Sequence, residues 1–400
     1  SLNDHEFVSN HCNNMAALRN SLWKFDLIKV AEITAIEQSK IQEAARIFAS
    51  ANPSAILYGL ETVPNDMRDA CVRGLVNLGL ATGNIGKPSS GLYPLFSGTN
   101  EQGSSDMGAL PNLLPGHRRV DDHNAKLQVE NAWGTNLSSK PGLGIRDLTA
   151  SIDNGKTKVL HLIGGSPNFT NGALSNFVDA TRNLDLLIVQ DTFRSELSDL
   201  ADVVLPSATF AQQEGTYTNL ERRIQLLRTA IGPKGEEETD GRIISKIAKR
   251  MGYKGFDHEN VSQVFDEIKT LVQMYEGISY DRLQSGGLQW PCTATNMSDT
   301  PILYAEEDAE RRFNLVAMDL TEPTQHENPE YPLLLAKGRI LHDADREMSV
   351  SKNGKRNGID RDEIFEIHTE DAQNLNLKDG DMIELVSPRE RIKGLVQISS

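Results

Sequence analysis

Glycine, proline and acidic residues stand directly after three short apolar runs between residues 158 and 223. Their types and spacing would allow these residues to bind a nucleotide. The runs read VLHLI, LLIV and DVVL, and they are followed by GGSP at 164–167, QDT at 190–192 and PS at 206–207. Glycine lets backbone N–H groups approach a phosphate closely, and an aspartate at a strand end can accept hydrogen bonds from a ribose or a guanine. An ordinary tight turn also explains the glycine pair, because the chain has no GxGxxG motif and GGSPN does not fit GxSxG.

These runs are too short for helices and are closed by glycine, aspartate or proline, so they predict buried parallel strands. Between the first two runs, residues 173–183 carry apolar side chains at helical spacing and supply the crossover that parallel strands require. In an open α/β sheet, ligands bind beyond the carboxyl ends of the strands, which is where the candidate residues stand. The sequence thus predicts an α/β fold with mainly parallel sheets.

A helix, a strand and a second helix are predicted upstream of this unit. Residues 36–52 have a helical pattern, and residues 55–59 read as a strand. Residues 66–82 predict the second helix, which ends before Gly83 as a glycine C-cap would. The expected buried face of this helix consists of Met67, Cys71, Leu75 and Leu78.

Two further stretches could take part in binding. Residues 83–116 are rich in glycine, proline and serine, and a loop of this length inside a compact domain is commonly functional. Arg222 and Arg223 follow a glycine turn, where they could bind a phosphate in bidentate fashion or form a solvated charge pair.

The composition argues against several classes of function. The 400 residues include 41 Lys and Arg against 56 Asp and Glu, a formal net charge of -15, which argues against nucleic acid or an anionic membrane surface as a partner. No apolar run approaches the roughly 20 residues of a membrane span. The three cysteines, Cys12, Cys71 and Cys292, are too far apart to bind an iron–sulfur cluster or to suggest a disulfide framework, and His5, His11 and Cys12 match no common metal-ligand spacing.

The order of several motifs resembles the molybdopterin oxidoreductase family. These motifs are TGNIGKPSSG, NEQGSSDMGALPNLLPG, GGSP, IVQDTF, ADVVLPSATFAQQEGTYTNLERR and PKGEEETDGRIISKIAKRMG, and the likeness covers nearly the whole chain. Within the family, the motifs are most similar to those of formate dehydrogenase catalytic subunits and of the large iron–sulfur subunit of NADH-quinone oxidoreductase, respiratory complex I.

The resemblance implies a C-terminal fragment with four parts, truncated at both ends. Residues 1–103 are expected to form an α/β domain and residues 104–253 a second, nucleotide-binding-like α/β domain. Residues 254–330 are expected to be a helical and irregular connector. Residues 331–400 are expected to form an incomplete molybdopterin-dinucleotide-binding β-barrel of the double-psi type.

The resemblance also implies a cofactor, molybdopterin guanine dinucleotide with molybdenum or tungsten, unless this member has lost it. Iron–sulfur clusters are expected only in an N-terminal region outside the chain. The protein ligand of the metal is expected upstream as well, so the sequence identifies no catalytic residue and no metal ligand. The candidate cofactor contacts are Gly164, Gly165, Pro167, Gln190, Asp191, Pro206, Ser207, Gly215, Thr216, His342, Arg346 and Met348.

Three functions remain open at this point. The first, preferred one is an electron-transfer protein resembling the large iron–sulfur subunit of NADH-quinone oxidoreductase, and the second is a catalytic subunit of a formate dehydrogenase-like molybdenum or tungsten enzyme. The third is a nucleotide-binding or structural module without redox chemistry. For the first two, the resemblance implies partner subunits of a respiratory or dehydrogenase complex and a cytoplasmic location, with attachment to the inner face of the cell membrane through those partners.

The loop at residues 93–103 distinguishes the first two functions. In formate dehydrogenases the similar loop has an arginine where Phe96 stands and a glutamine where Gly98 stands. The resemblance implies that this arginine holds the formate carboxylate, and a phenyl ring cannot donate charge-assisted hydrogen bonds. We therefore expect no formate oxidation, unless Lys87 or Arg118 has taken over the contact.

Overall fold

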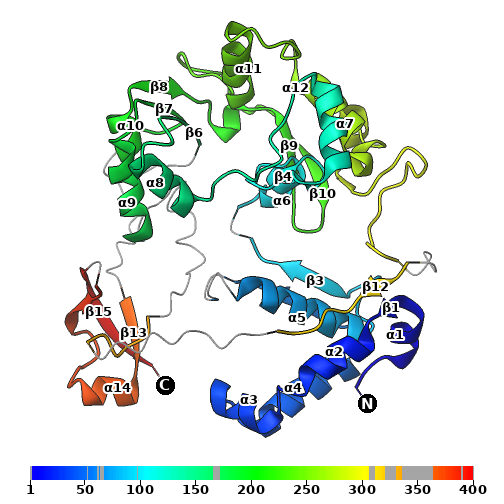
Figure 1. Cartoon of the computed structure of the whole chain (residues 1–400), viewed down its shortest axis with the longest axis vertical. Helices are drawn as coiled ribbons and strands as arrows, with labels where there is room; N and C mark the ends of the chain where they lie inside the picture. The colour runs from blue at the N-terminus through cyan, green and yellow to red at the C-terminus, as the bar shows by residue number, and fades with distance from the viewer. Residues whose placement is uncertain are drawn as a thin grey trace. The chain divides into compact units, whose positions relative to one another are not determined.

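The computed structural model describes residues 2–51, 53–60, 63, 67–96, 98–164, 172–305, 311–319, 330–335, 364–388 and 391–399, without the side chains of 172–175. The chain divides into two compact units. Figure 1 labels the helices and strands along the chain. Unit 1 contains residues 1–142 and 208–323, and unit 2 contains residues 143–207 and 324–400.

The first part of unit 1 is mainly helical and has a core of its own. Its core residues Phe7, Leu18, Leu80 and Leu315 are buried, so segments some 300 positions apart share one interior. A short parallel pairing of β1 with β12 joins the same segments. The elements are α1 (His5–His11), β1 (Cys12–Asn13), α2 (Met15–Leu22), α3 (Leu27–Thr34), α4 (Gln38–Ser50), β2 (Ala55–Tyr58), α5 (Arg68–Ala81), β3 (Gly91–Pro94) and β12 (Phe313–Asn314).

The second part of unit 1 surrounds a larger core, which includes Val129, Ile224, Phe265, Tyr275 and Ile278. Its sheet is antiparallel, with strand order β11-β10-β9. The elements are α6 (Glu101–Asp106), β4 (Leu113–Leu114), β5 (Arg118–Arg119), α7 (His123–Trp133), η1 (Phe210–Gln212), β9 (Gly215–Thr218), β10 (Arg223–Leu227), α11 (Asp240–Arg250), α12 (Val261–Leu271), η2 (Gln273–Tyr275), α13 (Tyr280–Leu283) and β11 (Leu288–Gln289).

Unit 2 contains the predicted βαβ unit. Its three strands are parallel in the order β6-β7-β8, which confirms the parallel pairing expected from the apolar runs. Ile152, Phe177, Leu187 and Leu197 are buried against this sheet. The elements are α8 (Ile145–Asp153), β6 (Val159–Ile163), α9 (Gly172–Thr181), β7 (Leu186–Asp191), α10 (Glu196–Leu200) and β8 (Val203–Pro206).

The described C-terminal residues form a small mixed sheet. β13 (Ile364–His368) runs parallel to β15 (Arg391–Ser399), and β14 (Met382–Val386) runs antiparallel to it. The helix α14 (Thr369–Asn374) is capped by His368, whose Nδ1 accepts from the backbone N–H of Glu370 at 3.3 Å. The predicted double-psi barrel stays a prediction, as does the division into four parts.

Two expectations about burial were wrong. On α5, Leu78 is 40% exposed, whereas Asn77 and Leu80 are buried. Most residues of this helix are apolar, so the pattern could not distinguish its faces. In the βαβ unit, the central strand β7 is largely buried, but Val204 on the neighbouring strand β8 is 50% exposed because β8 lies at an edge of the described sheet.

Candidate functional site

The carboxyl edge of the β6-β7-β8 sheet brings together five of the predicted contact residues. Register pairs Ile163 with Gln190 and Asp191 with Pro206. Beyond the strand ends, Gly164 N–H donates to the Gln190 carbonyl at 2.8 Å, and Ser207 N–H donates to the Asp191 carbonyl at 3.0 Å. The residues placed together at this edge are Gly164, Gln190, Asp191, Pro206 and Ser207.

Asp191 presents a carboxylate in a fixed orientation at this edge. Its Oδ1 accepts from the backbone N–H of Thr192 at 2.7 Å and lies 3.4 Å from that of Phe193. The neighbouring Gln190 is fully buried, and its Oε1 lies 3.1 Å from His161 Nε2 on β6. The two side chains therefore differ: Gln190 joins adjacent strands, whereas the side chain of Asp191, the last residue of β7, bonds to the backbone of the turn that follows.

The described residues leave space beside Gly164. Gly164 has a φ of +64°, a left-handed conformation that glycine adopts readily, and a Cβ built at this position would meet none of the described atoms within 4 Å. A backbone turn open to close approach and a carboxylate acceptor suit the nucleotide end of a pterin dinucleotide. The described residues of this edge therefore fit the cofactor that the resemblance implies.

Two of the other predicted contacts belong to unit 1, and five lie outside the described residues. Gly215 and Thr216 lie on β9 in unit 1, where they pair with Leu227 and Leu226 of β10. The remaining candidates lie outside the described residues, and they are Gly165, Pro167, His342, Arg346 and Met348.

Sequence reasoning missed a buried polar network around Asp106 at the end of α6. This side chain is fully buried, and its Oδ1 lies 2.6 Å from His117 Nε2 and accepts from Gln102 Nε2 at 2.9 Å. Its Oδ2 accepts from the Tyr275 hydroxyl at 2.6 Å. Burial, reinforced by the Asp106 carboxylate, raises the pKa of the Tyr275 phenol, so Tyr275 is a hydrogen-bond donor at ordinary pH.

The only sequence signal for this network was the DMGALP motif that begins at Asp106. Tyr275 stands 169 positions further along, with no local pattern to connect it to the motif. The network joins α6, the turn at His117 and η2, so it holds α6 against the core of unit 1. Residues 83–116, expected to be a loop, contain β3, α6 and β4.

The residues considered for carboxylate binding lie in different environments. Phe96 is 47% exposed. Arg118 is bound to its own unit, because its Nε donates to the Pro115 carbonyl at 2.8 Å and its Nη1 to Gln128 Oε1 at 2.5 Å. Its Nη2 is buried and forms no hydrogen bond with a described residue, and burial lowers the pKa of Arg118 against an opposing effect of Asp122.

Arg222 and Arg223 are also engaged within unit 1. Arg222 donates to the carbonyls of Trp290 and Thr300 and lies over the Trp290 ring, with 5.4 Å between the guanidinium carbon and the ring centroid. Arg223 donates to Gln289 Oε1 at 2.9 Å and to Glu221 Oε1 at 3.0 Å. Both arginines thus stabilise the β9-β10-β11 region, which leaves the phosphate alternative without support.

A model of the molybdopterin oxidoreductase family matches residues 4–250, and the chain belongs to this family. It is 35% identical over 99% of its length to the F420-dependent formate dehydrogenase 2 subunit alpha of Methanococcus maripaludis and 32% identical over its whole length to formate dehydrogenase H of Escherichia coli. It spans 59% and 56% of these two relatives. Acetylene hydratase from Pelobacter acetylenicus shares the fold, with a TM-score of 0.62 at 18% identity over the whole chain and 59% of that structure.

These findings favour the formate dehydrogenase-like alternative over the preferred likeness to the large iron–sulfur subunit of NADH-quinone oxidoreductase, which they do not show. None of the helices in the described part of the chain combines the length and the apolar character that crossing a bilayer requires. Within the same residues, no cluster of three or more His, Cys, Asp or Glu side chains is placed to hold a metal ion.

Proposed function

We propose that this chain is the pterin-dinucleotide-binding part of the alpha subunit of a formate dehydrogenase-like oxidoreductase. The supporting observation is 31–35% identity to formate dehydrogenase alpha subunits and related oxidoreductases over at least 97% of the chain. Molybdenum or tungsten held by the pterin would accept two electrons from the substrate. Iron–sulfur clusters and partner subunits in the rest of the complex would carry them onward.

The sheet edge in unit 2 would hold one nucleotide end of the cofactor. The open backbone at Gly164 permits close approach, and the Asp191 carboxylate is positioned to accept hydrogen bonds from a guanine or a ribose. Pro206 and Ser207 complete this edge. We propose Gly165, Pro167, Gly215, Thr216, His342, Arg346 and Met348 as further contacts on the resemblance alone, and Gln190 as the residue that fixes the strand ends.

The cofactor assignment is tested with Asp191→Ala in the full-length gene product. Loss of a charge-assisted hydrogen bond costs about 1.5 to 3 kcal/mol, or roughly a 10- to 150-fold loss in affinity for the pterin dinucleotide. Pterin content per chain is measured after dialysis against pterin-free buffer. Asp179→Ala is the control, because Asp179 is an exposed residue of α9 in the same unit. Equal pterin content in both variants would contradict the assignment.

Formate is the first substrate to test, and Phe96 provides the means. If the formate carboxylate lacks an arginine partner because Phe96 stands at this position, Phe96→Arg should raise the rate of formate-dependent viologen reduction by roughly 10² to 10⁴-fold. Bound metal and pterin with formate turnover support the proposal. A full-length protein that carries neither metal nor pterin would overturn it.

A likeness to the large iron–sulfur subunit of NADH-quinone oxidoreductase remains the second candidate function. It is favoured by Phe96, which stands where the resemblance implies the arginine for formate. Purified protein that holds iron–sulfur clusters without metal-loaded pterin would favour this candidate. For either function we propose a cytoplasmic location, with any attachment to the inner face of the membrane made through partner subunits.

A further inference from the structure

The start of α6 is fixed to a strand rather than to its own helix. Asn100 is the N-cap residue of α6, but its side chain forms no capping hydrogen bond. Its Oδ1 instead accepts from the backbone N–H of Thr218 on β9 at 2.8 Å, across 118 positions of the chain. Thr218 is buried, and a buried backbone donor needs a partner inside the protein. Asn100 therefore joins α6 to the end of β9.

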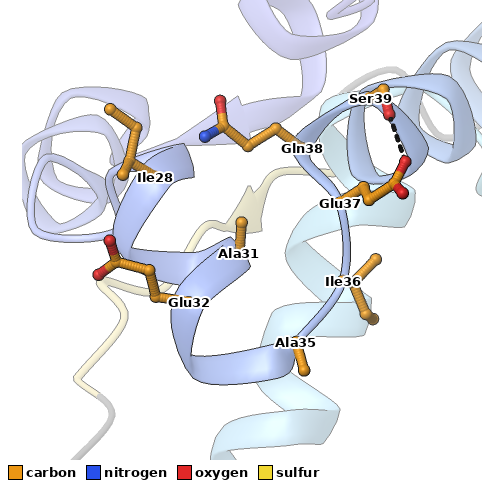
Figure 2. Close-up of a pocket in the computed structure, with 8 residues that line it drawn as sticks. All are labelled: Ile28, Ala31, Glu32, Ala35, Ile36, Glu37, Gln38 and Ser39. Carbon is orange, nitrogen blue, oxygen red and sulfur yellow. Dashed lines mark hydrogen bonds between the residues drawn. The ribbon is translucent and has the colours of Figure 1, made fainter.

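Other helices of unit 1 begin with local contacts. Asp122 accepts from two backbone N–H groups in the first turn of α7. Figure 2 shows a local contact at the start of α4, where Glu37 accepts from Ser39 Oγ at 3.2 Å beside an open hollow of about 560 Å³ lined by residues of the α3–α4 hairpin. A local bond holds a helix start only to its own helix. The bond of Asn100 determines where α6 lies against another element.

The middle of α6 approaches β9 so closely that Gly103 has no room for a side chain. Gly103 is buried, and a Cβ built on it would lie 2.3 Å from Asn100 Oδ1 and 3.2 Å from Thr218 Oγ1. At the other end of the helix, Asp106 accepts from the hydroxyl of Tyr275 in the core of unit 1. The helix is thus held at its start, its middle and its end, and it is a firm support for the residues that precede it.

Phe96 and Gly98 stand between two fixed points of unit 1. On one side, Leu95 N–H donates to the Tyr58 carbonyl of β2 at 2.8 Å. On the other side, Asn100 is bound to β9. Phe96 is half exposed, so its own ring does little to hold the backbone in place. The position of residue 96 therefore depends on the two fixed points, and Asn100 provides the second.

We propose that Asn100 is a positioning residue for the substrate loop, residues 93–103, because its bond to Thr218 fixes position 96 relative to β9. Position 96 is where the resemblance implies the substrate contact, and β9 carries Gly215 and Thr216, two of the proposed cofactor contacts. A misplacement of about 1 Å can cost roughly 10²-fold in rate. This inference rests on the proposed function, and it adds a residue that controls how the substrate loop meets the substrate.

The first test follows position 96 without any need for turnover. Phe96 is replaced by 4-fluorophenylalanine in the full-length gene product, and the fluorine NMR spectrum is recorded. Asn100→Ala removes the acceptor of the Thr218 N–H, and it is expected to shift and narrow the fluorine resonance because the loop loses one fixed point. Gly103→Ala is expected to have the same effect, since its Cβ would displace the Asn100 side chain.

Two further variants control this measurement. Asn100→Asp keeps an acceptor oxygen for the Thr218 N–H and should restore the wild-type resonance. Asn124→Ala removes the same side chain from an exposed position on α7 and should leave the resonance unchanged. A resonance that Asn100→Ala does not alter, or that Asn100→Asp alters equally, would overturn the proposal.

The second test asks whether the benefit of an arginine at position 96 depends on Asn100. The gain in kcat/KM for formate-dependent viologen reduction from Phe96→Arg should be roughly 10- to 10²-fold smaller in an Asn100→Ala background. The full gain should persist with Asn100→Asp and with Asn124→Ala. An equal gain with and without Asn100→Ala would overturn the proposal. No gain in any background would contradict the proposed function instead, and the fluorine spectra would then decide whether Asn100 positions the loop.

Discussion

At the scale of single residues, Asp106 is a buried carboxylate that contacts three other side chains. A buried carboxylate is costly unless its oxygens accept hydrogen bonds, and here His117, Gln102 and Tyr275 surround it. Removing one donor leaves an oxygen without its partner in the interior, and the cost is the desolvation of that oxygen.

We expect Tyr275→Phe to lower the free energy of unfolding of unit 1 by about 1 to 3 kcal/mol, because Asp106 Oδ2 loses its donor. Differential scanning calorimetry of the full-length protein would record this as a lower thermal midpoint. Tyr280→Phe is the matched control. Its ring packs against Phe265, and its hydroxyl forms no hydrogen bond in the described part of the chain, so a change below about 0.5 kcal/mol is expected. Similar losses in the two variants would argue against the network.

Glu237 predicts a pH dependence on the surface of unit 1. Its carboxylate accepts from the backbone N–H of Lys234 at 2.5 Å and from Gln212 Nε2 at 2.8 Å, and these bonds lower its pKa from 4.5 to about 2. A depressed pKa means that the carboxylate orders the turn fully above about pH 4.5. This contribution is lost as the pH falls from there through about 2.

The measurement is amide exchange at Lys234 between pH 5 and pH 2, compared with Glu237→Gln. Comparison with the variant removes the intrinsic acid dependence of amide exchange, which both proteins share. The glutamine at position 237 cannot ionise. Protection that falls with pH in the wild type and stays flat in the variant is the expected result. Parallel curves would show that the ionised carboxylate does not order this turn.

At the scale of elements, one amide side chain joins α5 to the segment that follows β12. Asn77 is buried, its Nδ2 donates to the Val316 carbonyl at 2.8 Å, and its Oδ1 accepts from the Val316 N–H at 3.0 Å. This pair of bonds satisfies the backbone of a residue 239 positions away. A polar residue therefore lies on the buried side of α5, where the apolar pattern of the sequence did not predict it.

We expect Asn77→Ala to destabilise unit 1 by about 1 to 3 kcal/mol, since both backbone groups of Val316 lose a partner inside the protein. Urea denaturation, followed by the loss of protection of α5 amides, would measure this effect. Asn20→Ala on α2 removes the same side chain from an exposed position and should be close to neutral. An equal effect of both substitutions would mean that the Val316 contacts contribute little.

At the scale of the whole molecule, the cysteines are distributed as packing residues. Cys12 and Cys292 are buried and Cys71 is half-buried. Cys292 Sγ donates to the Met297 carbonyl at 3.2 Å, and burial raises the pKa of the Cys12 thiol against an opposing effect of Arg312. A raised pKa disfavours the thiolate form that binds iron.

We therefore expect the full-length protein to keep all its iron and acid-labile sulfide when Cys12, Cys71 and Cys292 are replaced together by alanine. Iron and sulfide analysis per chain is the measurement, with the wild type prepared in parallel. Loss of one cluster's iron from the triple variant would show that a residue of this chain is a cluster ligand.

Local sequence alone determined the α/β class, the βαβ order around residues 158–207 and the position of Gly164, Gln190, Asp191, Pro206 and Ser207 at the carboxyl edge of that sheet. Strand length, turn residues and parallel crossovers depend on neighbours within a few positions, so the pattern carries this information. The position of Asp191 at the strand end was predicted in this way, because a strand end and the turn after it are both local.

Only the tertiary structure decided which buried polar side chains have hydrogen-bond partners and which residues those partners are. Asp106 meets Tyr275 across 169 positions and Asn77 meets Val316 across 239, and no periodicity in the sequence encodes such pairs. The same limit explains Arg222, which the sequence left open as a phosphate ligand and which bonds instead to carbonyls near residue 300. A buried polar group is stable only with a partner in place, and the chain brings that partner from far away by packing rather than by local pattern.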